Sequence, residues 1–446
     1  MHYVQFTEQD QAGMLKTIGV GSIAELYRDI PAEYRVRGEL DLPPPLSELE
    51  LLDDLAGLAR HNASCAELIC FLGCGAYDHF VPTVVDALSG QNGFLTGYTP
   101  YQAEASQGAL QVFFEFQTMV CQLTGMDIAN ASLYEMSTAL VEAVLIARQV
   151  TRRPNVVACR GLHPDNERVL HTYLAGEPFE FRQVPAPQGV VTPEALQAAV
   201  DETTAAVIIQ QPNFFGLIQP LDVLAPLVRQ AGALLIVVMD PLSAGVLKRP
   251  GELGADIVVA EGQPLGVPLS YGGPYLGLFA CRAEFLRRVP GRLIGQTVDA
   301  EGRRGFCMTL QTREQHIRRE RATSNICTNQ GLLATRAAIY MAAVGQRGIR
   351  QIAELCLHKA HYAAERIAAL PGYALRFDRP FFKEFVVRSD RPVDAVLAHA
   401  RSRGVLAGVA LGRWFDDLQD CFAVAVTEKR SKAEIDALVE ALAGVP

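Results

Sequence analysis

A run of basic residues followed by hydroxyl and amide side chains carries the clearest chemical signal in this sequence. Residues 312–330 read TREQHIRRERATSNICTNQ, and Arg321 is the last of five basic residues in that run. The polar residues that follow it are Thr323, Ser324, Asn325, Thr328 and Asn329. Hydroxyl side chains and free N–H groups at the start of a helix bind phosphate or carboxylate groups. The run therefore predicts an anion site, with a surface arginine cluster before an ordinary helix cap as the alternative.

A second candidate is a pair of tyrosines on a loop rich in glycine and proline. Residues 97–104 read GYTPYQAE, which places Tyr98 and Tyr101 three positions apart. Phenol groups on such a loop can orient a small substrate. Paired loop tyrosines serve packing as often as catalysis, so the residue types alone leave both readings open.

The third candidate is an aspartate at the end of an apolar run. Asp240 ends ALLIVVMD, and ADIVVAE follows at 255–261. In pyridoxal-phosphate enzymes of the aminotransferase-like fold, such an Asp pairs with the pyridinium nitrogen, and a Lys about two dozen residues later forms the Schiff base. Asp also ends strands for reasons of turn geometry, so this residue alone is an ambiguous sign.

The lysine that should accompany this aspartate is missing. After ADIVVAE the chain continues with Gly262, Gln263 and Pro264, and only six lysines occur in the whole sequence. Lys248 precedes the strand, in a polar turn that favours a solvated side chain. The sequence therefore predicts that this chain forms no covalent link to the cofactor at position 263.

Composition excludes several classes of protein. The 446 residues are 49% hydrophobic and 20% charged, with a net charge of -9, which is typical of a folded globular protein without a general attraction to nucleic acid or anionic membrane. The N-terminus lacks a signal-peptide pattern and no apolar run is long enough to span a membrane, so we expect a cytoplasmic protein. The ten cysteines form no CxxC pair, which favours reduced structural thiols and no metal site.

The elements expected to position these residues belong to an α/β fold. Helical patterns cover 103–124 and 133–150. Five apolar runs then predict buried strands of a mostly parallel sheet, at 155–160, 205–211, 233–240, 255–261 and 275–282. We expect an N-terminal arm at 1–70, a large α/β domain at 71–325, and a helical link with a small α+β domain at 326–446.

Several longer segments together resemble one family. They are FLGCGAYDHFVP, TGYTPYQAEASQG, SYGGPYLGLFA, GRRGFCMTLQTREQHIRRERATSNICTNQ, and GVLAGVALGR with AVTEKRSKAEID. From about residue 3 to 444 the chain is similar to the P-protein of the glycine cleavage system, glycine decarboxylase, in the form of the first of two subunits. The resemblance implies the aminotransferase-like fold, type I of the pyridoxal-phosphate-dependent transferases.

The same resemblance implies a function shared with a second chain. Pyridoxal phosphate would be bound by subunit 2, which decarboxylates glycine and passes the aminomethyl group to the lipoyl arm of H-protein. This chain would complete that site, with Arg321, Tyr98 and Tyr101 in catalysis. Thr323, Ser324, Asn325 and Thr328 would face the partner's cofactor. We expect a heterotetramer that is active only when assembled.

One departure from the family concerns the chain's own pocket. Residues 132–138 read SLYEMST, where the family usually has Asp-Gly in place of Glu135 and Met136. Because Met136 fills space that a phosphate would need, we expect the pocket around Asp240, Gln263 and Met136 to hold no phosphate. A free-standing pyridoxal-phosphate enzyme and a silent regulatory subunit are the rival hypotheses, and the role of Cys327 stays open.

Overall fold

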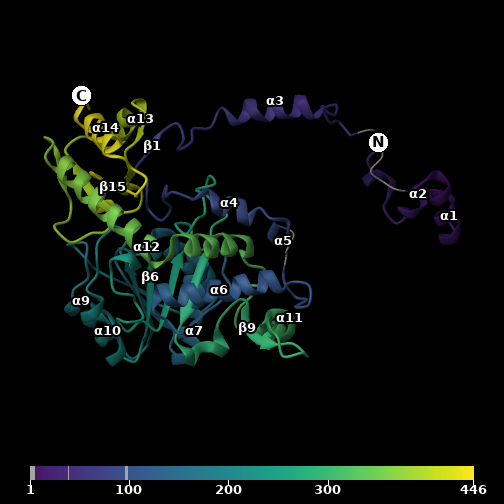
Figure 1. The fold of residues 1–446 in the computed structure, drawn as a ribbon, viewed down its shortest axis with the longest axis horizontal. Helices are drawn as coiled ribbons and strands as arrows, with labels where there is room; N and C mark the ends of the chain where they lie inside the picture. Colours follow the sequence, from purple (N-terminus) through teal and green to yellow (C-terminus); the bar gives the residue numbers. More distant parts are fainter. Residues whose placement is uncertain (1–5, 39, 96–98, 446) are drawn as a thin grey trace. The chain divides into compact units, whose positions relative to one another are not determined.

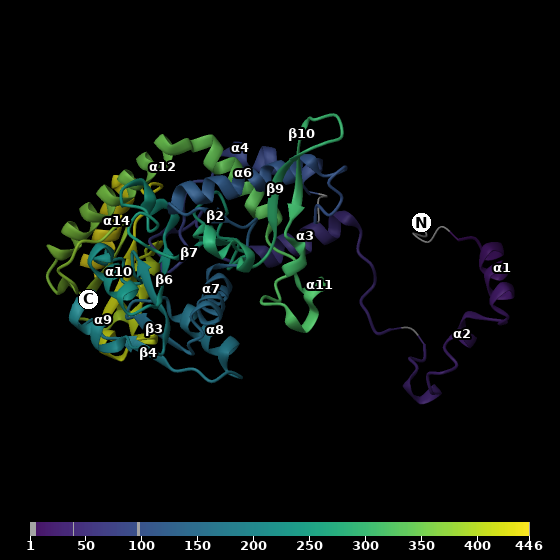
Figure 2. The same cartoon turned by 90° about the horizontal axis from the view of Figure 1, so that it is seen from below.

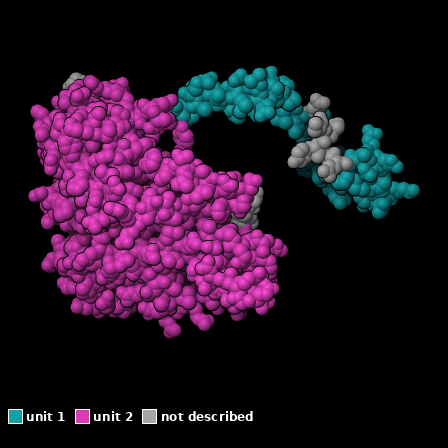
Figure 3. Space-filling model, viewed as in Figure 1, with its two compact units in different colours: residues 1–63 teal, residues 64–446 magenta. Residues whose placement is uncertain are grey.

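The structure is a computed structural model that describes residues 6–38, 40–95 and 99–445. The chain divides into two compact units, Met1–Ala63 and Ser64–Pro446, which Figure 3 colours separately. The division predicted at residues 70 and 325 stays a prediction. No helix in the described ranges combines the length and the apolar character that crossing a bilayer requires.

A seven-stranded sheet forms the centre of the second unit (Figure 1). Its strands, in spatial order, are β2 (Ile128–Ala129), β8 (Gly277–Cys281), β7 (Ile257–Glu261), β6 (Leu234–Met239), β5 (Thr204–Gln211), β3 (Asn155–Cys159) and β4 (Phe181–Val184). The pairs from β7 to β4 are parallel, whereas β8 is antiparallel to both of its neighbours. The five predicted strand runs and the mostly parallel sheet are thus confirmed.

Helices cover both faces of this sheet, because its central strands are apolar on both sides. Figure 2 shows α6 (Gln107–Thr124) and α12 (Gly331–Ala368) on one side, and α7 (Met136–Thr151) and α8 (Pro164–Leu174) on the other. The helices α9 (Pro193–Ala199) and α10 (Leu221–Gln230) pack on the same core as α6 and α12. This arrangement brings the carboxyl ends of β5, β6 and β7 to one edge of the sheet.

The C-terminal part has a sheet of its own. The antiparallel order is β11 (Tyr373–Leu375), β12 (Glu384–Ser389), β15 (Cys421–Ala425) and β14 (Val409–Ala410), with α13 (Val393–Ser402) and α14 (Lys432–Ala443). A short parallel pair, β1 (Ile69–Cys70) and β13 (Val405–Leu406), ties residue 70 to this part. The start of β12 lies close to the segment that follows β1, since the Cys74 N–H donates to Glu384 Oε1 at 2.7 Å.

The first unit carries amphipathic helices without a buried side. They are α1 (Glu8–Ile18), α2 (Ile23–Leu26) and α3 (Glu48–Ala59), and none of them has a buried residue. Thr7 and Ser47 form capping boxes at α1 and α3, so local sequence defines both helix starts. Most of their large apolar side chains are left exposed in this chain.

Candidate active site

Arg292 joins two of the predicted site segments. It lies just before β9 (Leu293–Val298), is 3% exposed, and its Nη2 donates to Tyr101 Oη at 2.8 Å and to the Cys327 carbonyl at 2.9 Å. Its guanidinium also lies 4.7 Å from the Tyr101 ring centroid, and Nη1 pairs with Glu314 at 3.1 Å. The loop of Tyr101 and the segment around residue 327 are therefore parts of one surface.

Most of the predicted polar residues lie in a segment without regular structure before α12. Thr323 and Asn325 are exposed, and Ser324 and Thr328 are half-buried. Ile326 anchors the segment, since it is buried in the core that α7 contributes to. The helix begins only at Gly331, and its N-cap residue Gln330 makes no side-chain cap bond. The expectation that these hydroxyls stand at the start of the helix is thus wrong, because the segment runs irregularly up to residue 330.

The arginines of this run differ in their surroundings. Arg313 is half-buried and donates to the carbonyls of Val289 and Gly291. Arg321, in contrast, is exposed, and among the described residues its ion-pair partner is the neighbouring Glu320 at 3.8 Å. Arg321 is therefore presented to solvent in this chain, with its fork of donors largely available to another molecule.

Of the two tyrosines predicted to belong to the site, the structure describes one. Tyr98 lies outside the described residues. Tyr101 is 52% exposed although its hydroxyl accepts the bond from Arg292. Its ring is held by a buried cation at one side and open at the other.

A separate pocket lies at the carboxyl end of β6, where Asp240 was predicted to matter. Its lining includes Gly75, Tyr77, Met136, Asp240 and Lys383. Lys383 comes from the residue before β12, and its Nζ lies 2.7 Å from Asp240 Oδ2. The prediction that no lysine lies near this aspartate is wrong. Lys383, at the start of the small C-terminal sheet and 143 positions further along the chain, contacts Asp240 in the folded structure.

The position where a cofactor lysine was expected is occupied by Gln263, whose side-chain amide is hydrogen-bonded through both its nitrogen and its oxygen. Gln263 is buried, and its Nε2 donates to the Tyr77 and Val267 carbonyls at 3.0 and 2.9 Å. Its Oε1 accepts from the Tyr77 N–H at 3.0 Å. Gln263 therefore anchors the segment after β1 to the sheet edge and offers no nucleophile.

The start of α7 closes the opposite side of the pocket. Glu135 caps this helix by accepting from the Thr138 N–H at 2.8 Å, and Glu261 Oε2 accepts from the Met136 N–H at 3.3 Å. Met136 is 9% exposed and lines the pocket. Burial raises the pKa of Glu261 to about 7, against three backbone N–H groups that favour its charged form.

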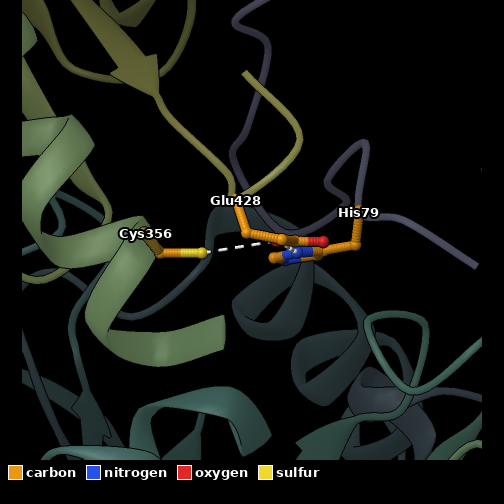
Figure 4. Close-up of side chains that lie close together, drawn as sticks. All are labelled: His79, Cys356 and Glu428. Atoms are coloured by element: carbon orange, nitrogen blue, oxygen red, sulfur yellow. Dashed lines mark hydrogen bonds and ion pairs between the residues drawn. The ribbon is translucent and has the colours of Figure 1, made fainter. Parts of the chain in front are cut away.

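Three further ionisable side chains, His79, Cys356 and Glu428, lie close together (Figure 4). His79 Nδ1 is 2.6 Å from Glu428 Oε2, and Cys356 Sγ is 3.4 Å from the same oxygen. Burial would raise the pKa of Glu428, but the contact with His79 lowers it to about 2. His79 and Cys356 thus both contact one oxygen of Glu428, and the three side chains form a hydrogen-bonded chain.

The comparisons with known proteins agree with this geometry. Residues 1–442 match the family described as glycine cleavage system P-protein. The chain belongs to the glycine cleavage system P-protein family. It is 49% identical over 440 residues to the probable glycine dehydrogenase (decarboxylating) subunit 1 of Geobacillus thermodenitrificans, covering 99% of this chain and 98% of the relative. The corresponding protein of Desulforamulus reducens is 47% identical over 445 residues, with full coverage of both chains.

Solved structures place the fold in the same family. A crystal structure of glycine decarboxylase (P-protein) in inhibitor-bound form is similar with a TM-score of 0.93 and 41% identity over the full length of both chains. Glutamate decarboxylase of Lactobacillus brevis shares the fold alone, with a TM-score of 0.71 and 14% identity over 93% of this chain and 96% of that one. The predicted fold, type I of the pyridoxal-phosphate-dependent enzymes, is confirmed.

Two important residues of this P-protein family member escaped the sequence reading. Arg292 lies in the segment VPGRLIGQ. Its apolar neighbours in the sequence indicate that this arginine is buried. Lys383 stands in RPFFKEFVV, where a lysine within an aromatic and β-branched run gives the same sign. A charged residue inside an apolar run needs a partner, and the sequence does not say which one.

Proposed function

We propose that this chain is the half of a glycine decarboxylase that binds no cofactor of its own and completes the active site of a pyridoxal-phosphate-bearing partner. The observation that carries the proposal is the absence of a lysine after β7, where Gln263 is tied into the backbone. The name of these relatives, subunit 1, supports a second subunit.

Exposed apolar side chains in and near α4 of the second unit also support a partner subunit. The helix α4 (Thr83–Ser89) packs against α12, and Arg336 of α12 donates to Asp86 of α4 at 2.6 Å. Apolar side chains of this part are exposed, namely Phe80, Val84, Leu88, Leu95 and Leu332. Large exposed apolar areas on a folded chain mark interaction surfaces.

The first unit supports the same conclusion independently. No residue of α1, α2 or α3 is buried, and many of their large apolar side chains, such as Ile18, Leu52 and Leu55, are exposed by more than 50%. Helices of 11 and 12 residues gain little stability by themselves in water, so they need an apolar surface to pack on. In the proposal the partner subunit provides it.

Within the proposed complex this chain binds an anionic group of the cofactor or substrate and orients glycine. Pyridoxal phosphate, held by the partner, would supply the electron sink for loss of carbon dioxide from glycine, and the aminomethyl group would pass to the lipoyl arm of H-protein. Arg321 would donate to a phosphate or carboxylate, with Thr323, Ser324, Asn325 and Thr328 adding neutral donors. Tyr98 and Tyr101 would orient glycine, the latter fixed by Arg292.

The test compares the full chain alone with the chain co-expressed with its lysine-bearing partner. Each preparation is mixed with excess pyridoxal phosphate, scanned for visible absorbance, reduced with borohydride and digested for mass analysis. We expect an adduct on the partner alone, and glycine-dependent carbon dioxide exchange from the complex only. A stoichiometric adduct on any of this chain's six lysines, together with exchange by the isolated chain, would overturn the proposal.

A further inference from the structure

The pocket at the end of β6 belongs to a fold that holds pyridoxal phosphate, and its own residues decide whether it fits that group. A fitting pocket needs a free carboxylate for the pyridinium nitrogen, free N–H groups or other donors for the phosphate, and room for the ring between them. The residues at these positions are Asp240 and the first turn of α7.

The carboxylate is already neutralised from within. Lys383 is 2% exposed, and its Nζ contacts Asp240 Oδ2 at 2.7 Å and His79 Nε2 at 2.9 Å. Its ammonium also lies 3.7 Å from the centroid of the Tyr77 ring, a cation–π distance. A buried ammonium with a carboxylate, an imidazole and a ring around it has no donor left to satisfy.

The protonation of His79 follows from its two neighbours. Because an ammonium can only donate, His79 Nε2 accepts from Lys383, and Nδ1 therefore carries the proton and donates to Glu428 Oε2. Burial, and then the charge of Lys383, lower the pKa of His79, which agrees with a neutral ring. The ion pair in the pocket thus consists of the positive charge of Lys383 and the negative charge of Asp240.

The anion-binding end is filled in the same manner. The Met136 and Thr138 N–H groups of α7 donate to the carboxylates of Glu261 and Glu135. These two internal carboxylates take the place that phosphate oxygens would need at a helix N-terminus. The Met136 side chain occupies the adjoining space.

The pocket therefore does not fit the cofactor of its fold. A ring between Asp240 and an amine would hold the two groups apart, whereas here they touch. We infer that Lys383 is a built-in replacement for the positive charge of the cofactor, and that it closes this chain's own pocket to pyridine ligands. This inference concerns residues of this chain alone and holds whether or not the proposed partner chemistry is correct.

The first part of the test measures the mutual dependence of the two charges. Thermal unfolding of the full chain is compared for wild type, Lys383→Met, Asp240→Asn and the double variant. We expect Lys383→Met to lower the melting temperature strongly, because it leaves a buried unpaired carboxylate, and Asp240→Asn to restore part of that loss in the double variant. Additive losses would show that the two charges do not neutralise each other and would overturn the inference.

The second part tests closure directly with pyridoxine, which has neither phosphate nor aldehyde and so reacts with no surface lysine. Equilibrium dialysis should show no saturable binding to wild type, binding to Lys383→Ala, and loss of that binding in Lys383→Ala/Asp240→Asn. Lys432→Met, on the exposed pair with Asp436, is the matched control and should behave as wild type. Binding to wild type that depends on Asp240, or no binding to folded Lys383→Ala, would contradict the inference.

Discussion

Arg292 and Tyr101 form one unit: the buried guanidinium donates to the tyrosine hydroxyl at 2.8 Å while lying over the face of its ring at 4.7 Å. The contact joins the start of β9 to a loop 191 positions away in sequence. The contact also leaves about half of Tyr101 exposed. A side chain fixed in this way is suited to contact a partner or substrate without reorganising.

Arg292→Met should damage both stability and activity. The substitution removes the partner of buried Glu314, one of whose oxygens already has no hydrogen bond, so we expect a loss of about 3–5 kcal/mol in the free energy of unfolding. Arg292→Met/Glu314→Gln should recover part of this loss without restoring the position of Tyr101. Denaturant unfolding and activity of the assembled enzyme separate the two effects. Full recovery of activity in the double variant would contradict the positioning role of Arg292.

Arg321→Ala should reduce turnover far more than assembly. An arginine fork that meets an anion in a preorganised site contributes about 2–4 kcal/mol, which corresponds to roughly a 10²–10³-fold loss in rate. Arg321→Lys should recover little, since a point charge does not reproduce the fork. Arg318→Ala, at an exposed arginine three positions earlier, is the matched control and should keep the rate.

The outcome also tests the regulatory alternative. If Arg321→Ala and Ser324→Ala keep full activity in an intact complex, the segment belongs to a surface cluster, and a stabilising subunit becomes the better explanation. Turnover measured on complexes isolated by size-exclusion chromatography keeps assembly and catalysis apart.

The sequence predicted the sheet well because buried parallel strands are continuous apolar runs that need no long-range information. It predicted the polar segment before α12 but placed it at the helix start, since the irregular stretch up to Gln330 has no local signal. It missed Arg292 and Lys383 as partners of Tyr101 and Asp240. Each of those pairs joins segments more than 140 positions apart, and residue types alone do not specify which buried charges meet.

The stability of the chain should carry a pH dependence from Glu142. This residue of α7 is 4% exposed, and burial raises its pKa from 4.5 to about 7, although a bond from Ser324 works against the shift. The folded state thus keeps a proton that the unfolded state has lost above pH 4.5. Stability from this group is present below pH 4.5 and falls as pH rises toward and through 7, by up to about 3 kcal/mol.

Glu142→Gln should make the slope of the wild type shallower by the part that Glu142 contributes, because the amide does not titrate. Urea unfolding of wild type and variant at a series of pH values between 4.5 and 8 measures the difference. Glu115→Gln, at an exposed acid on α6 whose side chain accepts a hydrogen bond from Gln111, serves as the control and should keep the wild-type slope. Parallel curves for wild type and Glu142→Gln would show that the buried carboxyl does not titrate in this range.

Cys327 should report on the proposed interface. It is exposed, whereas burial raises the pKa of the thiols of Cys70 and Cys121 to about 12 and about 11, which keeps them protonated and slow to alkylate. Iodoacetamide should therefore label the isolated chain first at Cys327. In the complex with the partner subunit the same residue should be protected, because the Cys327 carbonyl and Tyr101 both accept hydrogen bonds from Arg292 on one surface.

Peptide mass analysis after a short pulse of iodoacetamide measures the labelling of the free and the assembled chain, and Cys327→Ser removes the first label as a control. Equal labelling of Cys327 in the free and the assembled chain would place the interface on another face and would separate Tyr101 from the partner's site.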